Sequence, residues 1–445
     1  MTAEFFNKKF FKTAFIVFLI ALPIGAFLFI LFKYAVNLPF RDDWTGILLF
    51  LNSYLDAHGI IDKFNLIVEN QYDHRIAWTR IVSLLVFKVF GVIDFRVIIF
   101  IGALSVFIIL LCFWFAASDK SKNIEERLLL FLPVVFFLVQ PMYSEILFQA
   151  DGSVSGFYPI AFGVLALLIL DKKSSNSWAG LGLAFIAGTL GFFSHREGLA
   201  FLLAGTALLL FKKEWRNAVV WSVSVFLIFL FFQNYRVNLN SLYSFPFDFK
   251  RLIGSAVYFL AFIGNNFGLN RESGYMNSLP GFLKYIVSLL PFFVGICISI
   301  YIIFLAVKRY DKQNQFISSI LVAALIITVG ASLSRDAQKD ALVSRYRLAT
   351  VLYILSVYIS AIDLIIDRKI KMQAVKVFII ISMLFSAGAY ALKIKPIREH
   401  KIILVQSFKT YQETGKGLIS IAWNPEDPEP ILKESMRKKV WKIPE

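Results

Sequence analysis

The sequence predicts an all-α, polytopic membrane protein with about 11 transmembrane helices, because of its composition and the length of its apolar stretches. Of its 445 residues, 58% are hydrophobic and 48 are Phe, and the mean hydropathy is +0.69. Stretches of about 18 or more apolar residues are typical of spanning helices. The alternating pattern of a membrane β-barrel is absent from the sequence, so helices are the expected spanning elements.

The net charge of +16 indicates membrane orientation more than it indicates a partner. Much of the excess lies in short loops, where Lys and Arg mark the cytoplasmic side. The sequence has no basic and aromatic surface module, which argues against nucleic acid as a partner. Cys112 and Cys297 lie within apolar stretches, and we interpret both as small core residues and not as a disulfide or metal pair.

The first predicted span, 13–36, follows a group of lysines, which places the N-terminus in the cytoplasm. The first extracytoplasmic loop then covers about 37–93. Within it, 44–58 carries apolar residues at spacings of three and four and is too short to span, so we expect it to lie along the membrane interface. Gly59 is the predicted stop of this helix.

The stretch 76–92 allows two interpretations, because it is apolar but carries Arg80 and Lys88. As an interfacial helix it places the second span at 94–117 and the following basic loop in the cytoplasm. As a span it places that loop outside. The charge bias favours the interfacial interpretation.

Nine further spans follow, joined on the inside by basic loops, and the C-terminus is predicted to be outside. Two of them, 128–140 and 198–211, are short, and we expect them to extend into polar flanks or to break near the outer face, where irregular backbone lines a cavity. The polar tail, 393–445, is expected to pack as short helices on the outer face. The nine spans are 128–140, 158–170, 178–194, 198–211, 218–235, 284–307, 316–333, 346–366 and 373–392.

The first outer loop begins with Arg41, Asp42 and Asp43, where lipid gives way to water. Charges are costly at membrane depth unless they face a cavity or have partners, so this cluster is a candidate functional site. Either aspartate could accept the proton of an attacking hydroxyl as a general base. The alternative is structural, with Asp43 capping the interfacial helix and Asp42 solvated.

Arginines recur in the predicted outer segments, against the orientation bias. Guanidinium groups suit phosphate oxygens, so a converging set would hold a phosphate leaving group and neutralise its charge. For any single arginine, an ion pair or contact with lipid headgroups is the simpler explanation. Arg80 belongs to this set, and the candidate substrate-binding residues are Arg41, Glu69, Asp73, His74, Arg75, His195, Arg196, Glu197, Arg335, Arg345, Tyr346 and Arg347.

The sequence establishes no cofactor. The four histidines show no metal-ligand spacing, and a divalent cation held by Asp42, Asp43 or Asp73 is left open. A phosphate-cradling loop, a Ser/His/Asp motif and a dinucleotide fingerprint are all absent from the sequence. This argues against a cytoplasmic domain that uses a soluble nucleotide sugar.

The layout resembles the GT-C class of membrane glycosyltransferases, which includes protein O-mannosyltransferases and lipid A aminoarabinose transferases. The resemblance covers about the first 120 residues. It includes the acidic residue of the first outer loop and the segment 78–95, with Phe87-Lys88-Val89-Phe90-Gly91-Val92. His195-Arg196-Glu197-Gly198 and Ser344-Arg345-Tyr346 also resemble parts of bacterial members that decorate surface glycans.

This resemblance implies a polyprenyl-phosphate sugar donor and an acceptor hydroxyl of a cell-surface glycan or lipid, on the outer side of the bacterial inner membrane. Asp43 or Asp42 would be the base, and the arginines would bind the lipid phosphate. Many relatives carry Asp-Glu where this chain has Asp42-Asp43, and a larger soluble C-terminal domain is missing. The resemblance therefore does not decide which aspartate acts or what the acceptor is.

Three other functions remain open. A transporter or flippase for lipid-linked sugars often shows repeated halves with interrupted helices at mid-membrane, and no repeat is evident here. A glycan polymerase or ligase would be expected to carry a dominant late outer loop, whereas the densest cluster of this chain comes early. A non-catalytic scaffold would not need a pocket lined by acids and arginines.

Overall fold

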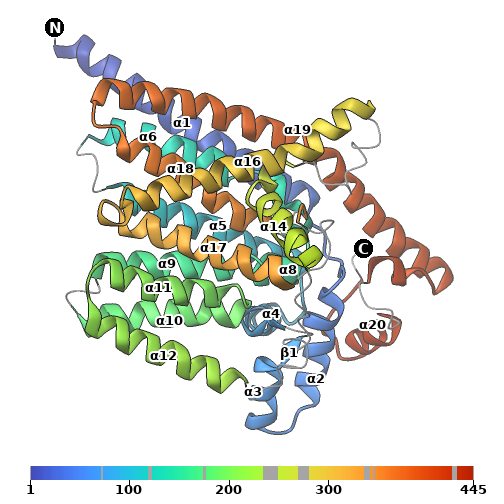
Figure 1. Cartoon of the computed structure of the whole chain (residues 1–445). Coiled ribbons are helices and arrows are strands. Elements are labelled where there is room, and N and C mark those ends of the chain that lie inside the picture. Colours follow the sequence, from blue (N-terminus) through green and yellow to red (C-terminus); the bar gives the residue numbers. More distant parts are fainter. Residues whose placement is uncertain are drawn as a thin grey trace. The chain divides into compact units, whose positions relative to one another are not determined.

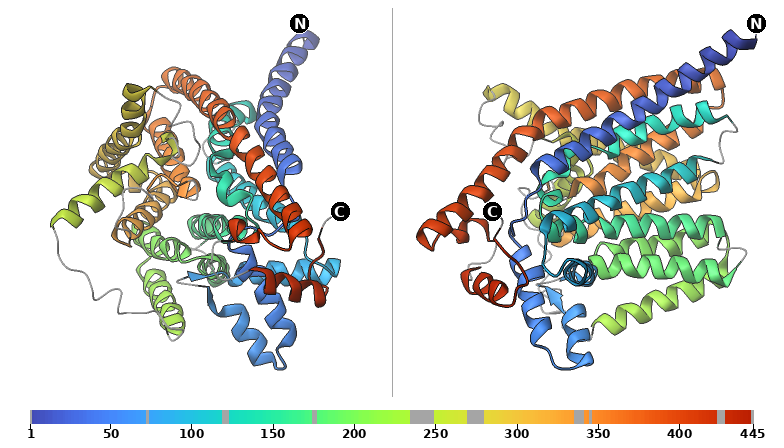
Figure 2. Two further views of the ribbon diagram at one scale, coloured as in Figure 1. Left: turned by 90° about the vertical axis from the view of Figure 1, so that its right-hand side faces the viewer. Right: turned by 180° about the vertical axis from the view of Figure 1, so that it is seen from behind.

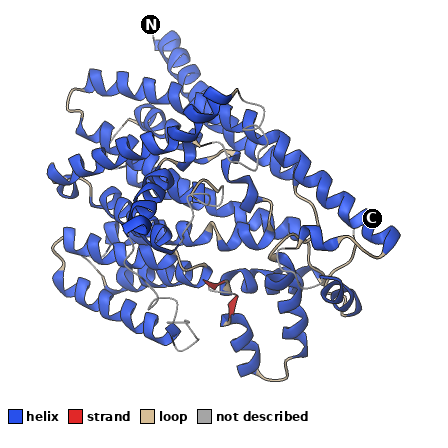
Figure 3. Cartoon of the chain, turned by 45° about the vertical axis from the view of Figure 1, so that its right-hand side comes forward, coloured by secondary structure: helices blue, strands red, loops and turns tan. Residues whose placement is uncertain are grey.

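The computed structural model describes nine stretches of the chain and confirms the all-α class (Figures 1 and 3). Of the described residues, 85% are helical. Within the described part, a single pair of two-residue strands, β1 (Asn70–Gln71) and β2 (His74–Arg75), forms an antiparallel hairpin. The described residues are 2–71, 74–118, 123–173, 177–233, 249–268, 280–334, 341–343, 346–422 and 428–443.

Among the described residues, 8 helices or helix runs are long and apolar enough to cross a membrane. This supports a multi-pass membrane protein, while the finer count of eleven spans stays a prediction. Predicted spans 178–194, 198–211 and 218–235 fall on shorter apolar helices. The eight candidates are Phe10–Tyr34, Phe95–Ala116, Ile124–Leu147, Ala150–Lys172, Tyr285–Val307, Gln315–Leu333, Arg347–Leu364 and Arg368–Thr414.

The chain divides into two compact units, which are described separately. Unit 1 contains Met1–Lys33, Val106–Tyr143 and Ala256–Lys395. Unit 2 contains Tyr34–Ser105, Ser144–Ser255 and Pro396–Glu445. The first outer loop and the tail therefore belong to one unit, although they lie at opposite ends of the sequence.

In unit 1, α18 (Arg347–Leu364) is almost entirely buried and packs against three neighbouring helices. The Tyr358 hydroxyl donates to the carbonyl of Leu130 at 2.7 Å, and the Tyr353 hydroxyl lies 2.8 Å from that of Thr328. These bonds satisfy polar groups that lipid would leave unpaired. The neighbours are α6 (Ile124–Leu138), α16 (Gly281–Val307) and α17 (Gln315–Ser334), and the unit also contains α1 (Thr2–Tyr34) and parts of α5 (Phe95–Ser118) and α19 (Arg368–Thr414).

In unit 2, four helices pack side by side (Figures 1 and 2). Trp221 lies in their core and donates from its indole N–H to the carbonyl of Leu202 at 2.8 Å. Gly198, at the start of the third of these helices, lets that helix pack closely against the second, since a Cβ at Gly198 would overlap the backbone of Gly191. The helices are α9 (Tyr158–Lys173), α10 (Trp178–Ser194), α11 (Gly198–Phe211) and α12 (Trp215–Gln233).

The first outer loop is built from short helices. The predicted interfacial helix is present as a π-helical turn, η1 (Trp44–Leu49), followed by α2 (Phe50–Asp56), and it ends before Gly59 as expected. The ambiguous stretch forms α4 (Ala77–Phe90), whose 14 residues are too few to cross a bilayer. Between them lies α3 (Ile60–Val68).

The tail differs from the prediction of short helices alone. The last span and the tail share one 47-residue helix, α19, which continues to Thr414. A buried stripe explains this continuation, because Ile397, Leu404, Phe408 and Tyr411 repeat at helical spacing and the next glycine is Gly415. Two short helices follow, η8 (Leu418–Ile421) and α20 (Pro428–Arg437).

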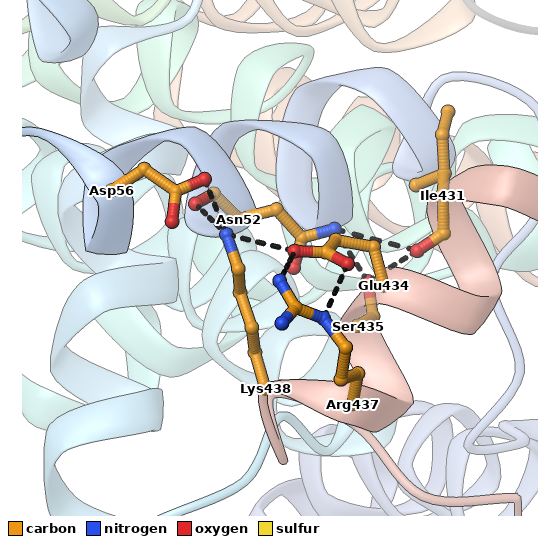
Figure 4. A network of polar contacts seen from close by, with 7 residues as sticks. All are labelled: Asn52, Asp56, Ile431, Glu434, Ser435, Arg437 and Lys438. Atoms are coloured by element: carbon orange, nitrogen blue, oxygen red, sulfur yellow. Dashed lines mark hydrogen bonds and ion pairs between the residues drawn. The ribbon is translucent and has the colours of Figure 1, made fainter.

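Helix α20 binds α2 of the first loop through a network of polar contacts (Figure 4). The Asn52 amide donates to the Ser435 hydroxyl at 2.9 Å and to the carbonyl of Ile431 at 3.3 Å. Lys438 donates to the Asn52 carbonyl at 2.9 Å and pairs with Asp56 and Glu434. Residues nearly 400 positions apart are thereby joined within unit 2.

The segment 141–157, between the predicted spans 128–140 and 158–170, is mostly buried and forms three short helices, η2 (Pro141–Tyr143), α7 (Ser144–Leu147) and α8 (Ala150–Ser155). Its lack of Lys and Arg fits this burial. Cys112 is buried as predicted, whereas Cys297 is exposed on α16, so its interpretation as a core residue was wrong.

Candidate functional site

Asp43 is a buried carboxylate, with 1% of its surface exposed. One oxygen accepts from the backbone N–H of Asp151 at 2.7 Å, and the other accepts from Phe40 at 3.0 Å and from Ala150 at 3.3 Å. Ala150 and Asp151 are the first two residues of α8, whose amide groups have no partners within the helix. Asp43 therefore caps a helix that lies 107 residues further along the chain.

The structural alternative, in which Asp43 caps the interfacial helix, is wrong, because Asp43 caps a different helix. Asp43 precedes η1, but its side chain makes no capping bond to that helix. Burial raises the pKa of Asp43 to about 7, and the charge of Asp42 acts in the same direction, while the three N–H donors oppose the shift. Near neutral pH this carboxyl group is therefore close to the midpoint of its titration.

Asp42 is the more accessible of the two carboxylates. Its side chain is half-buried, and one oxygen accepts from the Gln149 amide at 3.2 Å. Its backbone carbonyl accepts from the N–H of Gly46, which holds the start of η1. A carboxylate that is oriented by one amide and reaches the surface can accept a proton from an approaching hydroxyl.

Arg41 precedes the two aspartates in the sequence and has a strained backbone conformation, with φ of 51°. Its backbone N–H donates to the carbonyl of Ile421 at 2.7 Å, and its guanidinium pairs with Glu145 at 2.5 Å. Both partners belong to unit 2. The phenyl ring of the preceding residue, Phe40, packs edge-on against His400 of α19.

Behind these residues lies a buried polar group that includes Asp151, of which 3% is exposed. The charges of Asp42, Asp43 and Asp151 repel one another, and Arg80 offsets part of this repulsion. The side chain of Thr79 faces Asp151 and favours the charged form of its carboxyl group. The site is thus more acidic than the sequence alone indicated.

Arg80 was predicted to bind phosphate, but the structure gives it a different contact. Its guanidinium is buried and donates to the carbonyl groups of Leu66 at 2.6 Å and Glu69 at 2.7 Å, at the C-terminal end of α3. A cation at this end of a helix satisfies carbonyl groups that the helix leaves unbonded. Arg80 therefore shapes the loop.

The other predicted residues of the loop are placed as follows. Arg75 is buried in the hairpin and donates from Nε to the Asn70 side chain at 3.0 Å, while the side chain of Glu69 is exposed. Asp73 and the side chain of His74 lie outside the described residues.

The predicted turn His195-Arg196-Glu197 joins α10 to α11 in unit 2. Arg196 is exposed, and His195 and Glu197 are half-buried. Helix α10 contacts β2 of the first loop and α4, so this helix and the loop pack together. The structure does not pair the turn directly with Asp42 or Asp43 in any contact of the described residues.

Arg347 and Tyr346 belong to unit 1. Arg347 is fully buried, and its guanidinium donates to the carbonyl of Gly268 at 2.7 Å and to the Asn265 side chain at 3.4 Å. It thus holds the end of the segment 258–268, which forms the end of α14 (Phe249–Ile263) and the turn η3 (Asn265–Phe267). Arg335 and Arg345 lie outside the described residues.

Sequence reasoning missed Gln149, Glu145, Asp151 and Thr79. The first three lie in the segment 141–157, whose acids without a single Lys or Arg were the available signal. Among the described residues, no group of three or more His, Cys, Asp or Glu side chains is arranged to hold a metal ion.

Comparison of the chain with protein-family models, with curated proteins and with solved structures finds no match.

Proposed function

We propose that this protein is an integral-membrane glycosyltransferase, which moves a sugar from a polyprenyl-phosphate carrier to an acceptor hydroxyl on the extracytoplasmic side. The observation that carries the proposal is the half-buried Asp42 carboxylate, which Gln149 orients and which is followed in the sequence by the buried Asp43. Such a group suits proton abstraction at the edge of a membrane protein. The surface glycan or lipid that supplies the hydroxyl is the second substrate.

The reaction is a direct displacement at the anomeric carbon of the donor sugar. The acceptor oxygen forms the new glycosidic bond as the bond from the anomeric carbon to the phosphate oxygen breaks. The acceptor proton passes to the Asp42 carboxylate, and polyprenyl phosphate leaves with the bonding electron pair. Arg41, which directly precedes Asp42 and lies in the same unit, neutralises the charge that develops on this phosphate.

Asp42 suits the base role better than Asp43 because of what already occupies their oxygens. Both oxygens of Asp43 accept backbone N–H groups, and its side chain is buried. Proton transfer requires the base to come within hydrogen-bond distance of the hydroxyl, which only a reachable carboxylate can do. Asp43 then positions Asp42 by fixing α8 and the preceding Gln149.

The first prediction concerns Asp42→Asn. We expect it to lower sugar transfer by at least about 100-fold, because a positioned base contributes a factor of about 100 to 10,000. The assay uses the purified protein in liposomes with a panel of radiolabelled polyprenyl-phosphate hexoses and pentoses and membrane extract as the acceptor, and it follows the release of polyprenyl phosphate. Asp62→Asn is the matched control, because Asp62 is an exposed acid of α3 in the same loop.

Full activity of Asp42→Asn would remove the base assignment. Equal losses in Asp42→Asn and Asp62→Asn would point to the charge of the loop instead of one base. A wild-type protein that moves the labelled lipid across the bilayer without transferring its sugar would favour the transporter alternative.

A further inference from the structure

A second candidate site lies in unit 1, at the end where α5 and α18 finish and α6, α17 and α19 begin. Side chains from these five helices surround about 600 Å³ of space, part of which is open to the surroundings. None of the lining residues belongs to the candidate site around Asp42.

The walls of this cavity are apolar and its mouth is polar. Leu130 and Val134 of α6, Ile317 of α17 and Ile359 of α18 line the interior. All four lie on helices that are long and apolar enough to span the membrane. At the mouth, Asn314, Glu126, Asp363 and Lys371 bring polar and charged groups to the same opening. This arrangement fits a ligand with a polar head and an apolar chain.

The acids at the mouth already have partners. Glu126 pairs with Arg368 at 2.8 Å. Asp363 accepts from the Tyr310 hydroxyl at 2.6 Å and from the Asn314 amide at 2.9 Å. Lys371 is half-buried, and within the described structure its ammonium group makes no ion pair or hydrogen bond. Both donors to Asp363 are neutral and leave its charge in place, so the group at the mouth that can attract an anionic ligand is Lys371.

We propose that this cavity binds an anionic phospholipid, with the phosphate of the headgroup against Lys371 and the first part of an acyl chain along Leu130, Ile317 and Ile359. The positive charge of Lys371 favours an anionic headgroup. The apolar walls favour a ligand with an acyl chain over a free anion. The site lies where the spanning helices end, which is the depth of lipid headgroups. A lysine at this depth contributes about 1 kcal/mol of attraction to an anionic lipid.

The test uses the full-length purified protein, delipidated in a neutral detergent, and native mass spectrometry with added phosphatidylglycerol or phosphatidylcholine. We expect the wild-type protein to bind phosphatidylglycerol more tightly than phosphatidylcholine. Lys371→Gln should weaken phosphatidylglycerol binding about fivefold, which corresponds to the loss of one such attraction. Lys369→Gln is the matched control, since Lys369 is exposed two residues away, and its effect should stay below about twofold.

A second variant tests the apolar part. Ala116→Phe fills the cavity from α5 without changing its charge and should abolish the tight binding, provided that circular dichroism shows a folded protein. Inorganic phosphate at about 10 mM should not displace the lipid, because a free anion makes no contact with the apolar walls. Displacement by phosphate, equal binding of both lipids, or equal effects of Lys371→Gln and Lys369→Gln would each overturn the proposal.

Discussion

At the scale of single residues, the two adjacent aspartates have different surroundings. Asp43 is enclosed by backbone N–H groups, and Asp42 reaches the surface with Gln149 beside it. Asp43 directly precedes η1, and its side chain bonds to the first amide groups of α8, whereas the side chain of Asp42 bonds to Gln149. The pair therefore combines a positioning carboxylate with a reachable one.

The second prediction follows from the pKa of Asp43. Because burial raises this pKa from 3.8 to about 7, the native state holds a proton that the unfolded state has already lost across this window. The contribution of this group to the free energy of unfolding is therefore largest below about pH 4. It falls by about 1.4 kcal/mol per pH unit as the pH rises toward 7. Asp43→Asn should remove this component, which thermal unfolding between pH 4.5 and 7.5 would measure.

The control for this experiment is again Asp62→Asn, which changes an exposed carboxyl group of the same loop. Asp43→Asn also loses an acceptor for the α8 amide groups, so we expect an offset in stability of about 1–3 kcal/mol at all pH values. The decisive quantity is the slope against pH. An unchanged slope would contradict the assignment of this titration to Asp43.

The sequence predicted the location of these acids but not their contacts. A charged triplet after the first span is visible in the sequence, whereas the bond from Asp43 to α8 joins positions 107 apart and has no local signal. Arg80 illustrates the same limit. From the sequence, its positive charge is compatible with phosphate binding. Only the fold shows that its guanidinium binds the carbonyl groups at the end of α3.

At the scale of elements, the position of α8 depends on a close approach to α5. Gly102 of α5 lies against Ser153 of α8, and a Cβ at Gly102 would overlap the Ser153 hydroxyl and approach its carbonyl carbon to 2.7 Å. Such crossings of small residues are typical of packed membrane helices. The contact holds the helix that Asp43 caps.

The third prediction is that Gly102→Ala destabilises the protein by about 1–3 kcal/mol, because the added methyl group overpacks the α5–α8 contact. Thermal unfolding in detergent measures the change. Gly182→Ala is the matched control, since a Cβ at Gly182 of α10 meets nothing within 4 Å, and it should be neutral or stabilising by up to about 1 kcal/mol. A neutral Gly102→Ala would show that the two helices can separate freely.

Helices themselves were predictable because a spanning helix has a strong signal in length and apolarity. The burial of the segment 141–157 was not predictable, since the composition of this segment, with its polar residues and Pro141, indicates a loop. Its polar side chains are instead bonded to other protein groups, as Gln149 and Glu145 are to Asp42 and Arg41. Irregular backbone at this depth is stable when protein covers it.

At the scale of the whole molecule, the tail packs against the first outer loop. The Trp44 ring stacks on Phe408 of α19 at 6.0 Å, and Phe408 contacts Trp441 at 5.7 Å. The Trp441 ring also lies 6.4 Å from Phe95 at the start of α5, and the neighbouring Val440 accepts the N–H of Ile93. This aromatic cluster joins four distant parts of the sequence within unit 2.

The fourth prediction is that Trp441→Ala destabilises unit 2 by about 3–5 kcal/mol, because it removes a fully buried ring from the centre of that cluster. The loss should loosen the first outer loop, so limited proteolysis should cut between residues 44 and 68 faster while thermal unfolding shifts downward. Ile419→Ala is the matched control in the same tail, since Ile419 is 62% exposed and should change neither measurement by much. Equal proteolysis of the two variants would mean that the loop folds independently of the tail, and the tail would then have no part in positioning Asp42.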